Sequence, residues 1–184
     1  MKSVRREDIP DPEAYEKMRE AFRQEIMEVK KWRRVHLGSH LTFLFETTET
    51  IRYQVLEMLR IEDQWEEPEV NRELKTHNDL LADRGDLACT LLIEIEDPLQ
   101  RDILLGKWLD LPSCIYMELE DGSRITPDFD RGQAGVDRLS SVLYLKFPCG
   151  GKKPSRLGID KDGLQLDVQL NQTQQEALAA DLRI

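Results

Sequence analysis

The chain has 184 residues, 40% of them hydrophobic and 34% charged, a balance typical of a single globular domain spanning residues 1–184. This length is sufficient to bury a sizeable core, whereas no apolar run is long enough to cross a bilayer. Because the first residues contain no apolar signal-peptide segment, we expect a soluble cytoplasmic protein with no membrane partner.

The net charge of −10 is concentrated in residues 61–100, where 12 acidic and 3 basic side chains supply −9. Binding nucleic acid through a large surface requires that surface to be positively charged, so we expect no nucleic-acid partner. The three cysteines, Cys89, Cys114 and Cys149, are far apart and form no C-x-x-C pair. This spacing excludes a zinc ribbon or an iron–sulfur cluster built by this chain alone, and it predicts three separate thiols.

Asp11 followed by Pro12 is a typical helix start, with a capping carboxylate and then proline at the first helical position. Apolar residues then recur at steps of three and four, which predicts an amphipathic helix of about five turns. The helix ends in the basic run 30–34, which suits the negative end of the helix dipole. That run is either a solvated helix end or an anion site.

His36 and His40 follow the basic run, four residues apart. Two histidines at this spacing on a helix can hold a metal, so they are the candidate metal ligands and a divalent metal is the candidate cofactor. Gly38 lies between them, and a strand is predicted to begin at Leu41, so the helical geometry that the pair requires is not favoured.

Residues 41–46 alternate in a way that predicts an inner strand, which ends at Glu46. Thr47 or Thr48 can cap the helix that follows. The apolar face of that helix is bordered by Gln54, and Glu62 lies in the same direction further along. Two further polar residues lie on the opposite side, three positions apart and able to pair with each other: Glu57 and Arg60.

The rest of the chain alternates short helices and strands. Helices are predicted to begin at Glu66–Pro68 and at Asp97-Pro98, and a last helix is capped by Asn171 or by Thr173 with a capping box to Glu176. Strands are predicted at 87–96, 115–119, 142–147 and 164–170, and a hairpin turn at 121–122 leads into a return strand that contains Ile125. The first of these is apolar on both faces, so we expect an inner strand whose Glu94 needs a polar partner.

Helices cluster early and antiparallel strands late, which predicts an α+β fold. We expect a mixed or mainly antiparallel sheet of about five or six strands, with helices packed on it. Strand ends and the central helix then converge, and we predict one polar pocket there with His40 at its edge. Its predicted wall residues are Glu46, Gln54, Glu57, Arg60, Glu62 and Glu94. The alternative is that these residues form internal salt bridges and structural hydrogen bonds.

Four segments occur in an order that resembles a known family: RRVHLGSHLTFLFE, TIRYQVLEMLRIE, Asn78-Asp79-Leu80 and ACTLLIEIE. Over nearly the whole chain the sequence resembles the bacterial domain of unknown function 3501 (DUF3501) family. This resemblance implies no reaction. Members tend to be encoded beside rubrerythrin-like proteins and iron–sulfur oxidoreductases, which implies a redox or peroxide-stress setting. The family's motif block maps onto the six predicted pocket residues.

We therefore expect a bacterial accessory or binding protein that works with a redox protein partner. The alternative is a metal-dependent enzyme or metal-binding protein with a carboxylate-rich pocket, in which two carboxylates divide acid and base roles. A third reading is a purely structural subunit. No serine has a histidine placed to activate it, so whether the protein is an enzyme stays open at this point, as does a homo-oligomeric state.

Overall fold

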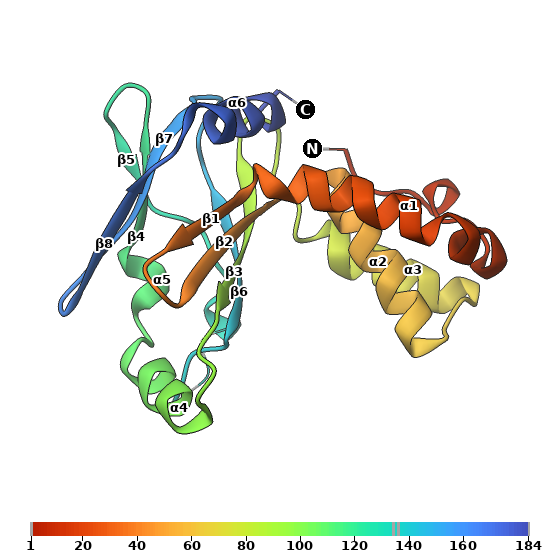
Figure 1. Ribbon diagram of the computed structural model, residues 1–184, viewed down its shortest axis with the longest axis horizontal. Helices are drawn as coiled ribbons and strands as arrows, with labels where there is room; N and C mark the ends of the chain where they lie inside the picture. Colours follow the sequence, from red (N-terminus) through yellow and green to blue (C-terminus); the bar gives the residue numbers. More distant parts are fainter. Residues whose placement is uncertain (1, 134, 136, 184) are drawn as a thin grey trace.

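The computed structural model describes residues 2–133, 135 and 137–183. The chain forms two lobes, one of helices and one mainly of strands (Figure 1). Each lobe has its own cluster of buried apolar side chains. The helical lobe consists of α1 (Pro12–Lys31), α2 (Thr48–Glu62) and α3 (Glu67–Asn78), with a short 3₁₀ helix at Arg6–Asp8.

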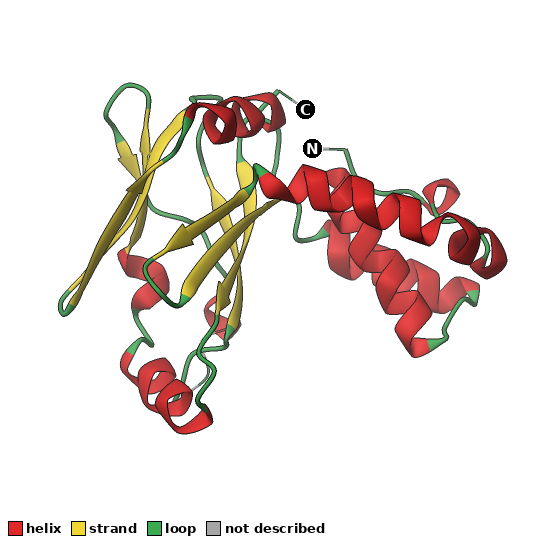
Figure 2. Ribbon diagram, in the orientation of Figure 1, coloured by secondary structure: helices red, strands yellow, loops and turns green. Residues whose placement is uncertain are grey.

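The strand lobe contains two antiparallel sheets of four strands each (Figure 2). The first sheet has the order β1-β2-β3-β6, and its strands are β1 (Arg34–Leu37), β2 (Leu41–Glu46), β3 (Leu87–Ile93) and β6 (Val142–Phe147). The second has the order β5-β4-β7-β8, with β5 (Arg124–Ile125), β4 (Ile115–Leu119), β7 (Pro154–Lys161) and β8 (Leu164–Gln169). The α+β class is confirmed, but the strands divide between two sheets instead of forming one of five or six.

Shorter helices flank the sheets: α4 (Pro98–Lys107), α5 (Leu111–Cys114), α6 (Gln172–Asp181) and a 3₁₀ turn at Arg131–Gln133. The carboxylate of Asp97 caps α4 by accepting the backbone N–H of Gln100 at 2.6 Å, as its position before Pro98 predicts. The last helix is capped by Asn171, which forms a capping box with Gln174. The predicted box between Thr173 and Glu176 is therefore wrong, because α6 begins one residue before Thr173.

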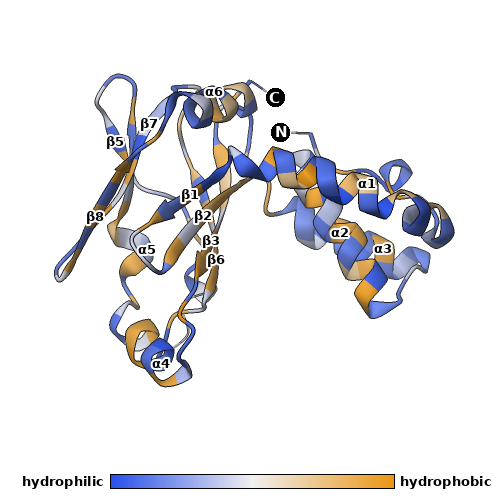
Figure 3. Cartoon of the chain, in the orientation of Figure 1, coloured by the Kyte–Doolittle hydropathy of each residue, from blue (hydrophilic) through white to orange (hydrophobic). Residues whose placement is uncertain are grey.

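The inner strands of the first sheet are confirmed. All six residues of β2 are buried, and β3 lies between β2 and β6. Alternate apolar side chains of this sheet pack against the second sheet and form the larger core. Hydrophobic residues concentrate on β2, β3 and β6, and in the helical lobe they are more frequent on α2 than on α3 (Figure 3). The predicted strand at 87–96 ends early, at Ile93.

The helical lobe forms as its sequence predicts. Asp11 caps α1 by accepting the backbone N–H of Ala14 at 2.8 Å, and Pro12 is the first helical residue. Thr47 caps α2 and forms a capping box with Thr50. The smaller core is shared by all three helices of the lobe. No helix in the described part of the chain is long and apolar enough to cross a membrane.

Candidate functional site

The candidate site lies on the outer face of the first sheet, defined as the side that points away from the second sheet. Strand register places eleven side chains there: Arg34, His36, Thr42, Leu44, Glu46, Ala88, Thr90, Leu92, Val142, Tyr144 and Lys146. The members on β2 are all buried, whereas those on the edge strand β6 are exposed. The helical lobe joins this face where β2 leads directly into α2, so polar groups of both lobes meet there.

Glu46 is the central residue of this junction, and it is only 1% exposed. Its Oε1 accepts hydrogen bonds from the Gln54 amide at 3.0 Å and from the Thr90 hydroxyl at 2.7 Å. Its Oε2 accepts a hydrogen bond from the Thr50 hydroxyl at 2.5 Å. All three donors are neutral, and among the described residues no cation forms an ion pair with this carboxylate.

The arrangement around Glu46 connects the two lobes. Thr90 belongs to β3 of the sheet, whereas Thr50 and Gln54 belong to the first two turns of α2. A buried carboxylate is costly unless its oxygens are hydrogen-bonded, and here three donors occupy both oxygens. Glu46 and Gln54, two of the predicted pocket residues, are thus hydrogen-bonded to each other, together with two threonines that were not predicted to take part.

Glu57 contacts residues of the helical lobe and not those of the junction. The reason is that α2 runs away from the sheet and alongside α1. Its carboxylate accepts two hydrogen bonds from Arg19, at 2.7 and 2.8 Å, and one from the Tyr15 hydroxyl at 2.6 Å. Hydrogen bonding to Arg19 and Tyr15 lowers the pKa of Glu57 to about 2. Burial, together with the Glu57 hydrogen bond, raises the pKa of Tyr15. The group is an ion pair inside the helical lobe.

The remaining predicted wall residues are also dispersed. Arg60 pairs with Glu16 of α1 at 2.8 Å instead of with Glu57. Glu62 lies 3.6 Å from Arg72 of α3. Glu94, just beyond β3, accepts a hydrogen bond from the Thr42 hydroxyl at 2.5 Å. Of the six predicted residues, the structure brings together only Glu46 and Gln54, since α2 is about 22 Å long and carries the later ones away.

The two candidate metal ligands lie around Glu94. The Thr42 hydroxyl donates its hydrogen to Glu94, so it accepts one from His36 Nδ1 at 2.9 Å. His40 Nδ1 lies 3.3 Å from the carbonyl oxygen of Glu94. His40 and Glu94 line a pocket of about 600 Å³ together with Ser39, Glu96, Asp97 and Gln100. The described residues contain no group of three His, Cys, Asp or Glu placed to hold a metal.

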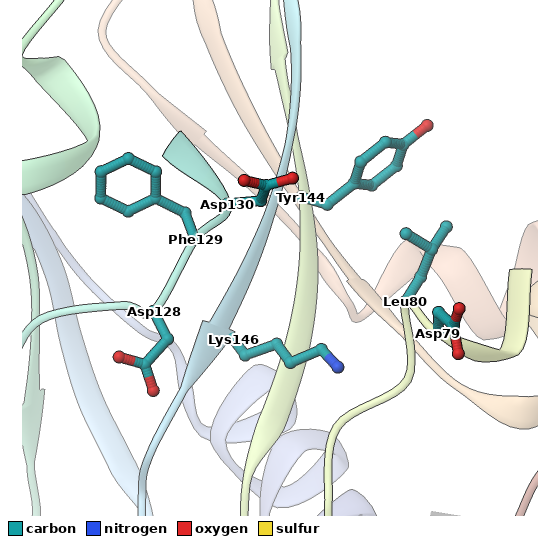
Figure 4. Close-up of a pocket in the computed structure, with 7 residues that line it drawn as sticks. All are labelled: Asp79, Leu80, Asp128, Phe129, Asp130, Tyr144 and Lys146. Atoms are coloured by element: carbon teal, nitrogen blue, oxygen red, sulfur yellow. The ribbon is translucent and has the colours of Figure 1, made fainter. Parts of the chain in front are cut away.

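A second pocket lies between the lobes, and the sequence patterns did not predict it. It has a volume of about 480 Å³, and its lining consists of Asp79, Leu80, Asp128, Phe129, Asp130, Tyr144 and Lys146 (Figure 4). Leu80 and Asp79 follow the end of α3, whereas Tyr144 and Lys146 project from β6 on the other side. The backbones of Asp128 and Lys146 are hydrogen-bonded to each other at 2.7 and 2.8 Å. We call this space the interlobe pocket.

The fold and these pockets define a two-lobed α+β protein with a polar junction. The chain belongs to the DUF3501 family of proteins of unknown function, whose model matches residues 3–182, and this confirms the resemblance that the sequence segments predict. None of the curated proteins compared with this chain is significantly similar to it. The fold is similar to that of a novel protein of unknown function from Burkholderia pseudomallei K96243, known from a crystal structure at 1.90 Å resolution. The two share 29% identity with a TM-score of 0.90, over 98% of this chain and 100% of that chain.

Proposed function

We propose that this protein is an accessory protein that binds a partner at the interlobe pocket, and that the partner is a redox protein. The redox setting is what the family resemblance implies, with rubrerythrin-like proteins and iron–sulfur oxidoreductases as the classes to test. The observation that carries partner binding is the interlobe pocket itself, where one lobe supplies Leu80 and the other supplies Tyr144.

The lining of the interlobe pocket suits a protein ligand. Tyr144 is 39% exposed on the edge strand, and aromatic residues of this kind are enriched at protein interfaces. Leu80 adds apolar surface on the facing side, whereas the ring of Phe129 points away from Tyr144 and packs on the larger core (Figure 4). Three aspartates and one lysine line the same space, so a partner segment with apolar and basic side chains complements it. At about 480 Å³ the pocket accommodates one or two side chains of such a segment.

The test is a binding titration with the rubrerythrin-like protein and the iron–sulfur oxidoreductase encoded in the same genome. Wild-type protein is expected to bind one of them, and Tyr144→Ala is expected to weaken binding by about tenfold or more, as loss of an aromatic anchor does. Ile61→Ala is the matched control, because Ile61 is 69% exposed on α2 and does not line the pocket. Binding of neither protein, or equal binding by both variants, would rule out the proposal.

Metal binding is the second candidate function, and the pocket shared by His40 and Glu94 is the observation that favours it. Elemental analysis of untagged protein tests it directly. Added divalent metal is then expected to raise the melting temperature of wild-type protein but not of His40→Gln or Glu94→Gln. If the metal content is negligible and neither variant alters the response to metal, this candidate is excluded.

A further inference from the structure

The outer face of α4 carries two large apolar side chains that are exposed to solvent. Leu99 is 75% exposed, more than any other large hydrophobic side chain among the described residues, and Ile103 is 58% exposed. They lie four positions apart and so share one face of the helix. The opposite face holds α4 on the protein, because Leu105 and Trp108 are buried in the larger core. Neighbouring exposed apolar side chains with charged residues around them are typical of protein interaction surfaces.

Charged residues of opposite sign lie at the two ends of this face. Glu96 precedes the first turn of α4, whereas Lys107 is its last residue, one turn after Ile103. Both are exposed, and neither forms an ion pair with another residue in the described part of the chain. The order along the face is therefore acidic, apolar, apolar, basic. We call these four residues the α4 stripe: Glu96, Leu99, Ile103 and Lys107.

We propose that the α4 stripe binds the same stripe of a second copy of this chain, with the two helices antiparallel across a twofold axis. A twofold contact uses the same surface on both copies, so that surface must complement itself. An antiparallel pair centred between Leu99 and Ile103 places Leu99 of one copy against Ile103 of the other. It also places the acidic end of each stripe against the basic end of the other, whereas parallel helices would bring like charges together.

The place of α4 in the fold leaves room for a second copy. It lies at the lower end of the strand lobe, away from the helical lobe (Figure 1). No residue of α4 lines the interlobe pocket, so the proposal does not depend on partner binding there. The flanking ion pair of Asp102 with Arg138 is neutral overall and does not oppose the contact.

The size of the contact sets the expected strength of the dimer. Two helices of ten residues each bury less than the roughly 800 Å² per partner that is typical of a stable interface. We therefore expect a weak dimer, with a dissociation constant on the order of 100 µM. Such a dimer forms at high protein concentration and dissociates on dilution.

The first experiment is sedimentation equilibrium of the full chain at concentrations below and above this dissociation constant. Wild-type protein is expected to follow a monomer–dimer equilibrium, and Leu99→Ser and Ile103→Ser are each expected to weaken it by about tenfold or more. Ile61→Ser is the matched control, because Ile61 is 69% exposed on α2 and lies outside the stripe. All three positions are exposed, so each variant is expected to keep the wild-type melting temperature.

The second experiment exchanges the charges at the ends of the stripe. Glu96→Lys and Lys107→Glu are each expected to weaken dimerisation by roughly tenfold, because each converts both end contacts of the dimer from attraction to repulsion. The double variant with both substitutions is expected to recover the wild-type dissociation constant. An equal mixture of the two single variants is expected to form heterodimers, since every end contact between them again joins opposite charges.

Four outcomes would overturn the proposal. They are a monomer at every concentration, growth beyond a dimer, equal weakening by Ile61→Ser, and no recovery in the double variant. A dimer that the Leu99→Ser and Ile103→Ser variants leave unchanged would likewise place the contact elsewhere on the protein.

Discussion

Glu46 and Glu57 are eleven positions apart, and each accepts three hydrogen bonds, yet their surroundings are opposite in kind. Glu57 is held inside the helical lobe by the guanidinium of Arg19 and the hydroxyl of Tyr15. Glu46 lies at the junction of the lobes and is held by two hydroxyls and one amide, all neutral. A carboxylate neutralised within one lobe has a structural role that its contacts explain. The buried carboxylate of Glu46 instead accepts hydrogen bonds from both lobes and so links them.

The largest expected effect comes from removing the junction carboxylate. Glu46→Leu leaves two hydroxyls and one amide without their acceptor, and we expect it to lower the free energy of unfolding by about 3–5 kcal/mol, at roughly 1–3 kcal/mol per unsatisfied group less what rotation of the hydroxyls recovers. Urea unfolding measures this loss. Glu62→Leu is the control, since Glu62 is exposed on the same helix, and it is expected to change stability by at most about 0.5 kcal/mol. Similar losses in both variants would remove the distinction between Glu46 and an ordinary surface carboxylate.

The next effect concerns the ion pair inside the helical lobe. Glu57→Gln retains the shape of the side chain but loses the charge that Arg19 neutralises, so we expect a loss of about 1.5–3 kcal/mol, typical of hydrogen bonds to charged groups. Both side chains are largely buried, with 17% of Glu57 and 26% of Arg19 exposed. Urea unfolding at neutral pH measures the loss, and an unchanged midpoint would show that the pair is not stabilising.

The same pair predicts a pH dependence. The folded state lowers the pKa of Glu57 from its ordinary value of 4.5 to about 2, so the carboxylate stabilises the fold fully above pH 4.5. This contribution is lost progressively as the pH falls from 4.5 to about 2. Wild-type protein is therefore expected to lose more stability over this window than Glu57→Gln does. Parallel stability curves for the two proteins would contradict the assignment.

A smaller effect is expected from a single donor to Glu46. Thr90→Val replaces the hydroxyl with a methyl group of similar size and is expected to cost about 1–2 kcal/mol, because Glu46 Oε1 then retains only the Gln54 amide. Thr173→Val, at an exposed position of α6, is the control. If Thr90→Val leaves stability unchanged, the hydrogen bond that the sheet donates to Glu46 does not stabilise the junction.

Sequence patterns predicted the elements and the neighbourhoods formed by residues that are close together in the chain. The strand ending at Glu46 and the cap at Thr47 follow from patterns in residues 41–48, and Gln54, which hydrogen-bonds to Glu46, lies only eight positions after it. The partner of Glu57 did not follow, because Arg19 lies 38 positions away on another helix. For the same reason the interlobe pocket was missed, since its walls come from three separate segments.

Two strands were not predicted, and the reason in each case lies in the strand's own sequence. β1 has only four residues and begins inside the basic run, so its alternation is too short to recognise. β7 contains Gly158 in its interior and begins at Pro154, and both residues weaken a strand signal. Gly158 is required there because the ring of Tyr116 lies across its backbone, where a β-carbon would collide with it. Without β7 the second sheet is not recognisable from sequence.

The smallest expected effect comes from an ion pair at the protein surface, which we compare with the buried pair of Glu57 and Arg19. Arg60 and Glu16 lie 2.8 Å apart, but 35% and 57% of their side chains are exposed, so solvent screens the attraction and side-chain entropy offsets it. Arg60→Gln is expected to cost about 0–0.5 kcal/mol, well below the loss in Glu57→Gln on the same helix. Urea unfolding of both variants in low and high salt measures the difference, and salt is expected to reduce the Arg60→Gln effect further. If Arg60→Gln lowered stability as much as Glu57→Gln does, then burial would not explain a difference in stabilisation between the Arg60–Glu16 pair and the Arg19–Glu57 pair.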